Sequence, residues 1–121
     1  MNPAELFRQE TDPLRLAPGD FLFREGDSGE KVYVLLEGEM EILLGDLVLE
    51  NAGPGTLIGE MALIDDSPRT ASAVARTSCR LAEIDRRRFH FLVQQTPNFA
   101  THVMKTLADR LRHMNAVAAA Q

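Results

Sequence analysis

Several residue types that define other protein classes are scarce in this chain of 121 residues. Cys79 is the single cysteine, so no internal disulfide can form, and a lone cysteine fits a reducing compartment. No segment approaches the roughly 18 consecutive apolar residues of a membrane-spanning helix. Residues 1–6 lack the basic and apolar blocks of a signal peptide. We therefore expect a cytoplasmic protein that does not contact a membrane.

The charge balance also excludes a class of partner. The formal net charge is −5, whereas the surface of a nucleic-acid-binding protein is typically basic. We therefore expect no nucleic-acid partner. The run Arg86–Arg88 is a local exception, and its simpler interpretation is a solvated helix start beside Asp85. The length, with 45% hydrophobic and 26% charged residues, predicts one domain over residues 1–121 with a single modest core.

The sequence contains little that could support catalysis. Its three histidines, His90, His102 and His113, all lie in segments predicted to be helical. Jelly-roll enzymes of the cupin type would need histidine and carboxylate ligands on strands. No Ser/His/Asp or Cys/His set can be assembled either. We expect no metal, no cofactor and no catalytic residue, and a cupin-like enzyme is the least favoured alternative. Cys79 lies in an apolar alternation and is predicted to be buried.

The middle of the chain predicts a mainly β domain. Between about residues 12 and 85, short apolar segments are separated by Gly, Pro and Asp turns, and Glu37–Gly38 is predicted to close a hairpin. About eight short strands at this spacing indicate a sandwich or barrel. Beyond a first strand from residue 14, the expected strands cover residues 21–23, 32–36, 40–44, 47–49, 57–58, 71–75 and 79–84. Residues 3–10 predict a short helix that docks Leu6 and Phe7 on this domain.

The C-terminal part, about residues 86–118, predicts two helices. Asp85 can cap the first, which runs to residue 95, and Thr96 can cap a second that begins at Pro97. Apolar residues of the second helix recur every three or four positions: Phe99, Val103, Leu107, Leu111, Met114 and Ala118. This stripe either packs on the β domain of its own chain or forms a homodimer, with Leu107, Leu111 and Met114 at the seam.

The run of residues 58–71 carries the clearest chemistry. Gly59 permits a positive φ or a close backbone approach. The amides of residues 60–62 are expected to be free donors at the start of a short helical turn, which favours an anion. Arg69 can form two hydrogen bonds to phosphate oxygens. Glu60 can accept a hydrogen bond from a ribose hydroxyl. These features predict a pocket for a small sugar phosphate.

This run resembles the phosphate-binding cassette of cyclic nucleotide-binding domains, which act in kinase regulatory subunits, gated channels and bacterial regulators such as the catabolite activator protein. The family motif reads Gly-Glu-apolar-Ala-Leu, a variable turn, then Pro-Arg-(Ser/Thr/Ala)-Ala. Here it is filled by Gly59, Glu60, Met61, Ala62, Leu63, Pro68, Arg69, Thr70 and Ala71. The resemblance covers about residues 14–115. It implies a double-stranded β-helix, the jelly-roll β-roll, with a short N-terminal helix and two C-terminal helices.

The resemblance also implies a sensor that binds cAMP, or alternatively cGMP, and signals by repositioning its last helix. The implied phosphate and ribose contacts are Gly59, Glu60, Met61, Ala62, Arg69, Thr70 and Ala71. The base is expected to point toward the last helix, with candidate contacts at Ile42, Leu49, Arg110, Met114 and Asn115. Arg110 is expected to approach the cassette glutamate.

Two questions stay open at this point. Thr70 accompanies cGMP binding in some family members and serves the phosphate alone in others, and Glu50 could accept hydrogen bonds from guanine. We favour cAMP. The alternative to a sensor is a degenerate scaffold domain of the same fold, although Glu60 and Arg69 are both present. The chain ends where family members attach their output, so we expect a stand-alone sensor or part of a longer protein. Its downstream partner cannot be named.

Overall fold

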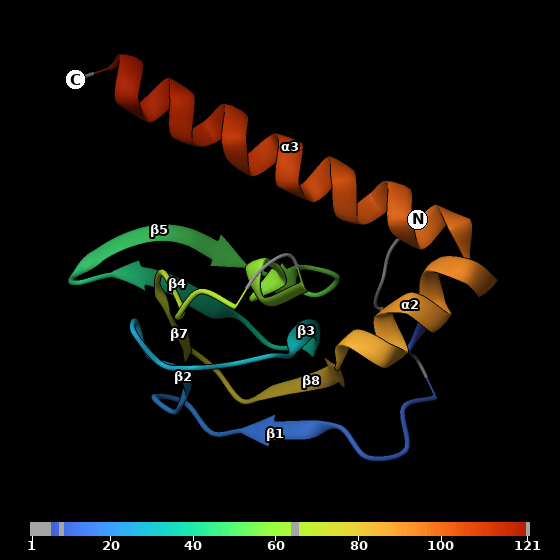
Figure 1. Cartoon of the computed structure of the whole chain (residues 1–121). Coiled ribbons are helices and arrows are strands. Elements are labelled where there is room, and N and C mark those ends of the chain that lie inside the picture. Colours follow the sequence, from blue (N-terminus) through green and yellow to red (C-terminus); the bar gives the residue numbers. More distant parts are fainter. Residues whose placement is uncertain (1–5, 8, 64–65, 121) are drawn as a thin grey trace.

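The computed structural model describes residues 6–7, 9–63 and 66–120, and in these ranges eight strands form two four-stranded antiparallel sheets (Figure 1). The first sheet has the order β1 (Leu14–Leu16), β8 (Cys79–Ile84), β3 (Val32–Glu37) and β6 (Leu57–Ile58). The second has the order β2 (Phe21–Phe23), β7 (Ser72–Ala75), β4 (Met40–Leu44) and β5 (Leu47–Ala52). The remaining elements are the 3₁₀ helix η1 (Glu60–Leu63), α2 (Arg86–Gln95) and α3 (Pro97–Ala119). This is the predicted jelly-roll β-roll with two C-terminal helices.

Strand β3 explains how one small domain has two apolar layers. Its sequence Val-Tyr-Val-Leu-Leu is apolar without interruption, as expected for a strand that is covered on both faces. Val32, Val34 and Leu36 face a cluster that includes Phe99 and Val103 of α3. Leu35 faces the opposite way and packs between the two sheets. Cys79 is buried in the same inner layer, as predicted.

One predicted hairpin is wrong. Strands β3 and β4 are not paired, because β3 lies between β6 and β8 while β4 lies between β5 and β7. Glu37–Gly38 is therefore a crossover from one sheet to the other. Gly38 has φ 94°, and a Cβ there would meet the carbonyl oxygen of Ser78. The polar pair Glu-Gly favours a turn, but the sequence does not say which strands the turn connects.

The two helices begin where their caps predict. The Asp85 carboxylate accepts a hydrogen bond from the Arg88 amide at 2.7 Å, and α2 ends at Gln95 before Thr96. Phe99 of α3 makes edge-on ring contacts with Phe89 of α2, and Phe7 does the same from the N-terminal segment. Half of the predicted N-terminal helix, residues 3–5 and 8, lies outside the described residues. Phe7 is docked as predicted, whereas Leu6 is 38% exposed, so its predicted docking is wrong.

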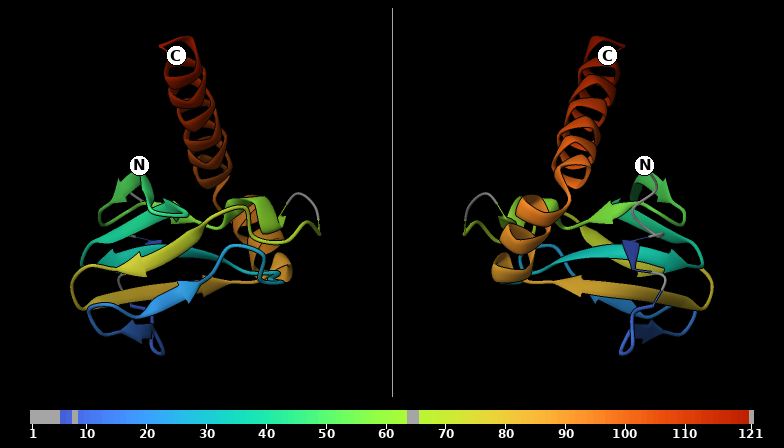
Figure 2. Two further views of the ribbon diagram at one scale, coloured as in Figure 1. Left: turned by 90° about the vertical axis from the view of Figure 1, so that its left-hand side faces the viewer. Right: turned by 90° about the vertical axis from the view of Figure 1, so that its right-hand side faces the viewer.

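The apolar stripe of α3 packs on its own β-roll only in the first half of the helix. Phe99 and Val103 are buried in the apolar layer, and Leu107 packs partly against it. Leu111 and Met114 are 59% and 67% exposed, and the C-terminal end of the helix extends away from the strands (Figure 2). The alternative in which one chain buries the whole stripe is therefore wrong, because α3 rises away from the strands toward its C-terminus (Figure 1). Among the described residues, neither helix combines the length and apolarity needed to cross a membrane.

Candidate functional site

The cassette begins with a turn that only glycine adopts easily. Gly59 follows the buried strand β6 and has φ 80°, as the sequence predicted. The 3₁₀ helix η1 then starts at Glu60. The Ala62 amide donates to the Gly59 carbonyl at 3.2 Å, so the expectation of three free amides is wrong for Ala62. The tight i to i+3 turn uses that amide earlier than an α-helix would.

Arg69 is the buried cation of the site, with 9% of its surface exposed. Its guanidinium donates to the Lys31 carbonyl at 2.8 Å and to the Gly59 carbonyl at 3.2 Å. It also lies over the Phe23 ring, 4.2 Å from the ring centroid. Its Nε is buried without a partner, and within the described residues no carboxylate forms an ion pair with it. Burial lowers the pKa of Arg69, the result expected for a cation removed from water.

Two glycines and one loop shape the space around this guanidinium. A Cβ at Gly29 or at Gly59 would collide with guanidinium nitrogens of Arg69. The loop between β2 and β3 also holds the Arg69 backbone, since the Gly26 amide donates to the Arg69 carbonyl and the Arg69 amide to the Asp27 carbonyl, each at 2.8 Å. The sequence reading missed Gly29 as a site residue. The one signal for Gly29 in the sequence is a second glycine in the loop that connects residues 23 and 32.

Glu60 is joined to the last helix by Arg110. Arg110 Nη1 forms an ion pair with Glu60 Oε2 at 2.5 Å, so the predicted approach of this arginine to the cassette glutamate is confirmed. Arg110 also binds both carboxylate oxygens of Glu50, at 3.0 and 3.1 Å, and the Leu57 carbonyl. Burial alone would lower the pKa of Arg110, but the hydrogen bond to Glu50 and the charges of Glu60 and Glu50 outweigh it and raise this pKa.

The other predicted ligand-binding residues are less closely associated with Arg69 and Glu60. Thr70 and Met61 are exposed, and Ala71 is half-buried before β7. Ile42 packs partly against the layer between the sheets. Leu49 on β5 is exposed, and so are Met114 and Asn115, which lie about one turn beyond Arg110 on α3. The structure therefore brings together Gly59, Glu60, Arg69 and Arg110, while the base contacts stay predictions.

The run Arg86–Arg88 is not simply solvated, which corrects the sequence reading. Arg86 donates to the Ala62 carbonyl at 3.3 and 3.4 Å and to Asp66 Oδ1 at 2.6 Å. Arg88 donates to the Glu83 carbonyl at 2.8 Å and pairs with Glu10 at 2.9 Å. Arg87 is exposed. The run could not be interpreted from the sequence because its acceptors lie elsewhere in the chain.

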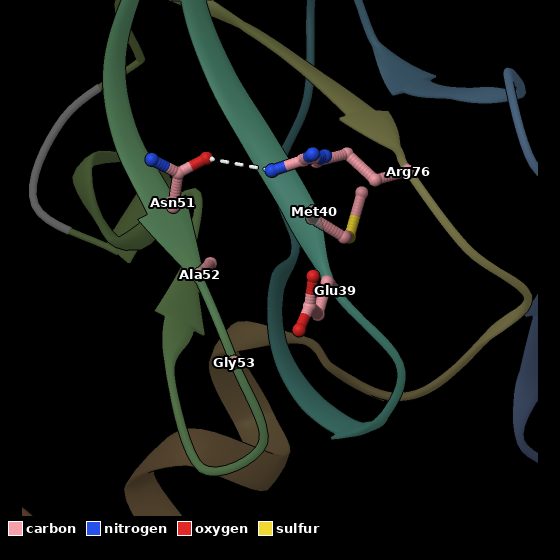
Figure 3. Close-up of a pocket in the computed structure, with 6 residues that line it drawn as sticks. All are labelled: Glu39, Met40, Asn51, Ala52, Gly53 and Arg76. Atoms are coloured by element: carbon pink, nitrogen blue, oxygen red, sulfur yellow. Dashed lines mark hydrogen bonds between the residues drawn. The ribbon is translucent and has the colours of Figure 1, made fainter.

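A separate hollow lies at the far end of β7, with a volume of about 150 Å³ (Figure 3). Its lining consists of Glu39, Met40, Asn51, Ala52, Gly53 and Arg76. Arg76 donates to Asn51 across it at 3.4 Å. Arg69 precedes β7 and Arg76 follows it, so the strand separates this hollow from the cassette. None of the predicted site residues lines it.

The histidines show no metal-binding arrangement. His90 and His113 are exposed on the helices, while His102 is half-buried and burial lowers its pKa. No group of three or more His, Cys, Asp or Glu side chains in the described part of the chain is placed to hold a metal ion.

Both the sequence and the fold of this chain are similar to those of known proteins. The family model for the cyclic nucleotide-binding domain matches residues 13–96. The chain belongs to this family. The CRP-like cAMP-activated global transcriptional regulator of Mycobacterium tuberculosis is 28% identical over 112 residues, which cover 88% of this chain and 50% of the relative. The solved catabolite activator protein of Thermus thermophilus has a TM-score of 0.80 and 30% identity, over 97% of this chain and 57% of that one.

A third similar structure is described with the words "A cyclic-GMP-dependent signalling pathway regulates bacterial phytopathogenesis". It has a TM-score of 0.76 and 31% identity, and the alignment covers 92% of this cyclic nucleotide-binding domain and 94% of that chain. The domain spans about half the length of the mycobacterial relative. Because that relative is named a transcriptional regulator, the absence of a nucleic-acid partner stays a prediction, made only from the charge of these 121 residues. Two of these relatives are named a transcriptional regulator and a catabolite activator protein, which is compatible with a non-catalytic role for this domain.

Proposed function

We propose that this domain is a cyclic-nucleotide sensor in which Arg69 binds the cyclic phosphate and Glu60 binds the ribose 2′-hydroxyl. The observation that carries the proposal is the environment of Arg69. A buried charge without a counter-ion is expensive, by several kcal/mol for an ion that is fully removed from water. The guanidinium contacts two carbonyls and an aromatic face, and its Nε has no partner. Phosphate oxygens supply the negative charge and the acceptor that this side chain lacks.

The ion pair between Arg110 and Glu60 supports a signalling role for α3. Glu60 Oε2 bonds Arg110, and the second carboxylate oxygen can accept from a ribose hydroxyl. A bound nucleotide would then fix the same carboxylate that holds the helix. Binding would favour the arrangement in which α3 is docked, which is a shift in a conformational equilibrium. Met114 and Asn115 on this helix, together with Ile42 and Leu49 on the β-roll, are the proposed contacts to the base.

Glu50 supports a preference for cAMP over cGMP. A carboxylate at this position could accept from the N1 and N2 donors of guanine, but both oxygens of Glu50 are bonded to Arg110. Guanine would have to share this carboxylate with Arg110, which holds its orientation, whereas adenine makes no such demand. Thr70 is exposed beside Arg69 and is assigned to the phosphate alone. Competition binding with Thr70→Ala tests this assignment: equal losses of cAMP and cGMP affinity are expected, and a selective loss of cGMP affinity would reverse the preference.

Calorimetric titration of the wild-type domain tests the function itself. We expect binding of cAMP, weaker binding of cGMP, and much weaker binding of 5′-AMP, whose phosphate carries additional charge and lacks the ring to the 3′-oxygen. No metal or other cofactor is part of the proposal. An absence of heat with either cyclic nucleotide at millimolar concentration would favour the scaffold alternative. Equal affinity for 5′-AMP and cAMP would refute a pocket for a cyclic phosphodiester.

A further inference from the structure

Arg86 occupies a position that does not favour its charge as a helix residue. It is the first residue of α2, and the positive end of a helix disfavours a cation by about 0.3–1 kcal/mol. The cap is provided by Asp85, so Arg86 is not needed to begin the helix. Its guanidinium instead contacts the cassette, where it bonds the Ala62 carbonyl and the Asp66 carboxylate. The reason for an arginine here is therefore found in the cassette.

The two acceptors lie between the functional side chains of the cassette. Ala62 is two residues after Glu60, and Asp66 is three residues before Arg69. A displacement of Arg86 would therefore act on the segment that sets the separation of Glu60 and Arg69. The Arg86–Asp66 pair is exposed, at 43% and 84% of the side chains, so it adds little to overall stability. Its effect is expected in the geometry of the cassette.

The cassette is thus held by one arginine from each C-terminal helix. Arg110 of α3 bonds Glu60 and the Leu57 carbonyl at its start. Arg86 of α2 bonds Ala62 and Asp66 farther along. We infer that Arg86 is a positioning residue that couples the cassette to α2, so that a shift of α2 changes nucleotide affinity. The ligand in this inference rests on the proposed function, whereas the coupling between Arg86 and the cassette does not.

The test compares Arg86→Gln with Arg87→Gln, which removes the same charge from an exposed neighbour in the same turn. Amide hydrogen exchange of the 59–69 segment, measured without nucleotide, should be about two- to fivefold faster in Arg86→Gln at an almost unchanged melting temperature. Affinity for cAMP by calorimetry should fall by a similar factor. Arg87→Gln should change neither. An exchange rate in Arg86→Gln equal to that of wild type would overturn the inference.

The partner of Arg86 gives a second test. Asp66→Asn should reproduce part of the effect of Arg86→Gln, because it keeps the bonds from Arg86 to the Ala62 carbonyl. The double variant should be no worse than Arg86→Gln, because that variant already removes the partner of Asp66. The charge swap Arg86→Asp with Asp66→Arg should restore slow exchange only in part, because an aspartate at position 86 cannot donate to the Ala62 carbonyl. Fully additive losses would contradict the coupling. If the wild-type domain binds neither cyclic nucleotide, the proposed function fails, and the exchange rates alone still decide the role of Arg86.

Discussion

Arg110 on α3 and Glu60 in the cassette form an ion pair of 2.5 Å that joins the last helix to the candidate ribose-binding acid. Glu50 shares the same guanidinium, so one cation separates two carboxylates that come from different elements. This arrangement links binding chemistry to helix position through a single side chain.

Replacing the Arg110 side chain should destabilise the folded protein. Arg110→Met should lower the free energy of unfolding by about 2–4 kcal/mol, because it leaves two partly buried carboxylates without their partner. Urea denaturation measures this loss. Arg112→Met is the matched control, since Arg112 is exposed two residues farther along the helix and pairs with Asp109 of the same helix. Adding Glu50→Gln to Arg110→Met should recover part of the loss. No recovery would mean that repulsion between Glu50 and Glu60 is unimportant.

The close packing around Arg69 predicts that alanine substitutions at two glycines differ strongly in their effect on cAMP affinity. Gly29→Ala places a methyl group against the guanidinium, whereas a Cβ at Gly53 would have no atom within 4 Å. Neither position has a positive φ, so backbone strain does not enter the comparison. We expect Gly29→Ala to weaken cAMP binding at least about tenfold, a cost near 1.4 kcal/mol, with Gly53→Ala unchanged. Equal affinities in calorimetry would show that Arg69 need not keep this position.

The contact between α2 and α3 should depend on a buried ring. Phe99→Ala should cost about 3–5 kcal/mol of unfolding free energy, since Phe99 is 0% exposed and touches the rings of Phe7 and Phe89. Phe91→Ala is the control, because that ring is 60% exposed on α2. A similar loss of stability in both variants would contradict the assignment of Phe99 to the core.

The exposed half of α3 predicts self-association. Leu111 and Met114 are exposed, which fits the predicted seam, while Leu107 already packs partly against its own chain. We expect a homodimer through this helix, in which Asn115 of one chain can reach the base bound to the other. Light scattering should give the mass of a dimer, with or without nucleotide, and Leu111→Glu should return it to that of a monomer. A wild-type monomer at high micromolar concentration in both states would rule out the dimer.

Local patterns predicted the parts of the site that are continuous in sequence. Gly59, Glu60 and Arg69 lie within one short run, so their chemistry and spacing could be read directly. Contacts between segments that are far apart in the sequence could not be predicted in this way. Glu50 and Arg110 are 60 residues apart, and Arg86 is 24 residues from the carbonyl that it bonds. Nothing local distinguishes Glu50 from a solvated strand acid, because its role depends on how α3 crosses the β-roll.

In the fold, too, local patterns were predictable from the sequence and long-range pairing was not. Strand and helix positions follow from apolar periodicity and caps, and most were predicted within a few residues. Strand β5 continues to Ala52, beyond the expected end at residue 49, because Glu50 and Asn51 remain paired with β4 although they are polar. Strand pairing after Glu37–Gly38 was wrong, since turn residues specify a change of direction but not the sheet that receives the next strand.

The most direct test of the proposed function is the affinity of Arg69→Ala for cAMP, measured by calorimetry beside the wild type and Arg76→Ala. Arg76 is an exposed arginine at the other end of β7, so its loss should leave affinity unchanged. Removing the cation from a desolvated charge pair costs about 2–5 kcal/mol, so Arg69→Ala should bind about 30-fold to 5,000-fold more weakly. Binding of cAMP by Arg69→Ala with wild-type affinity would contradict the account.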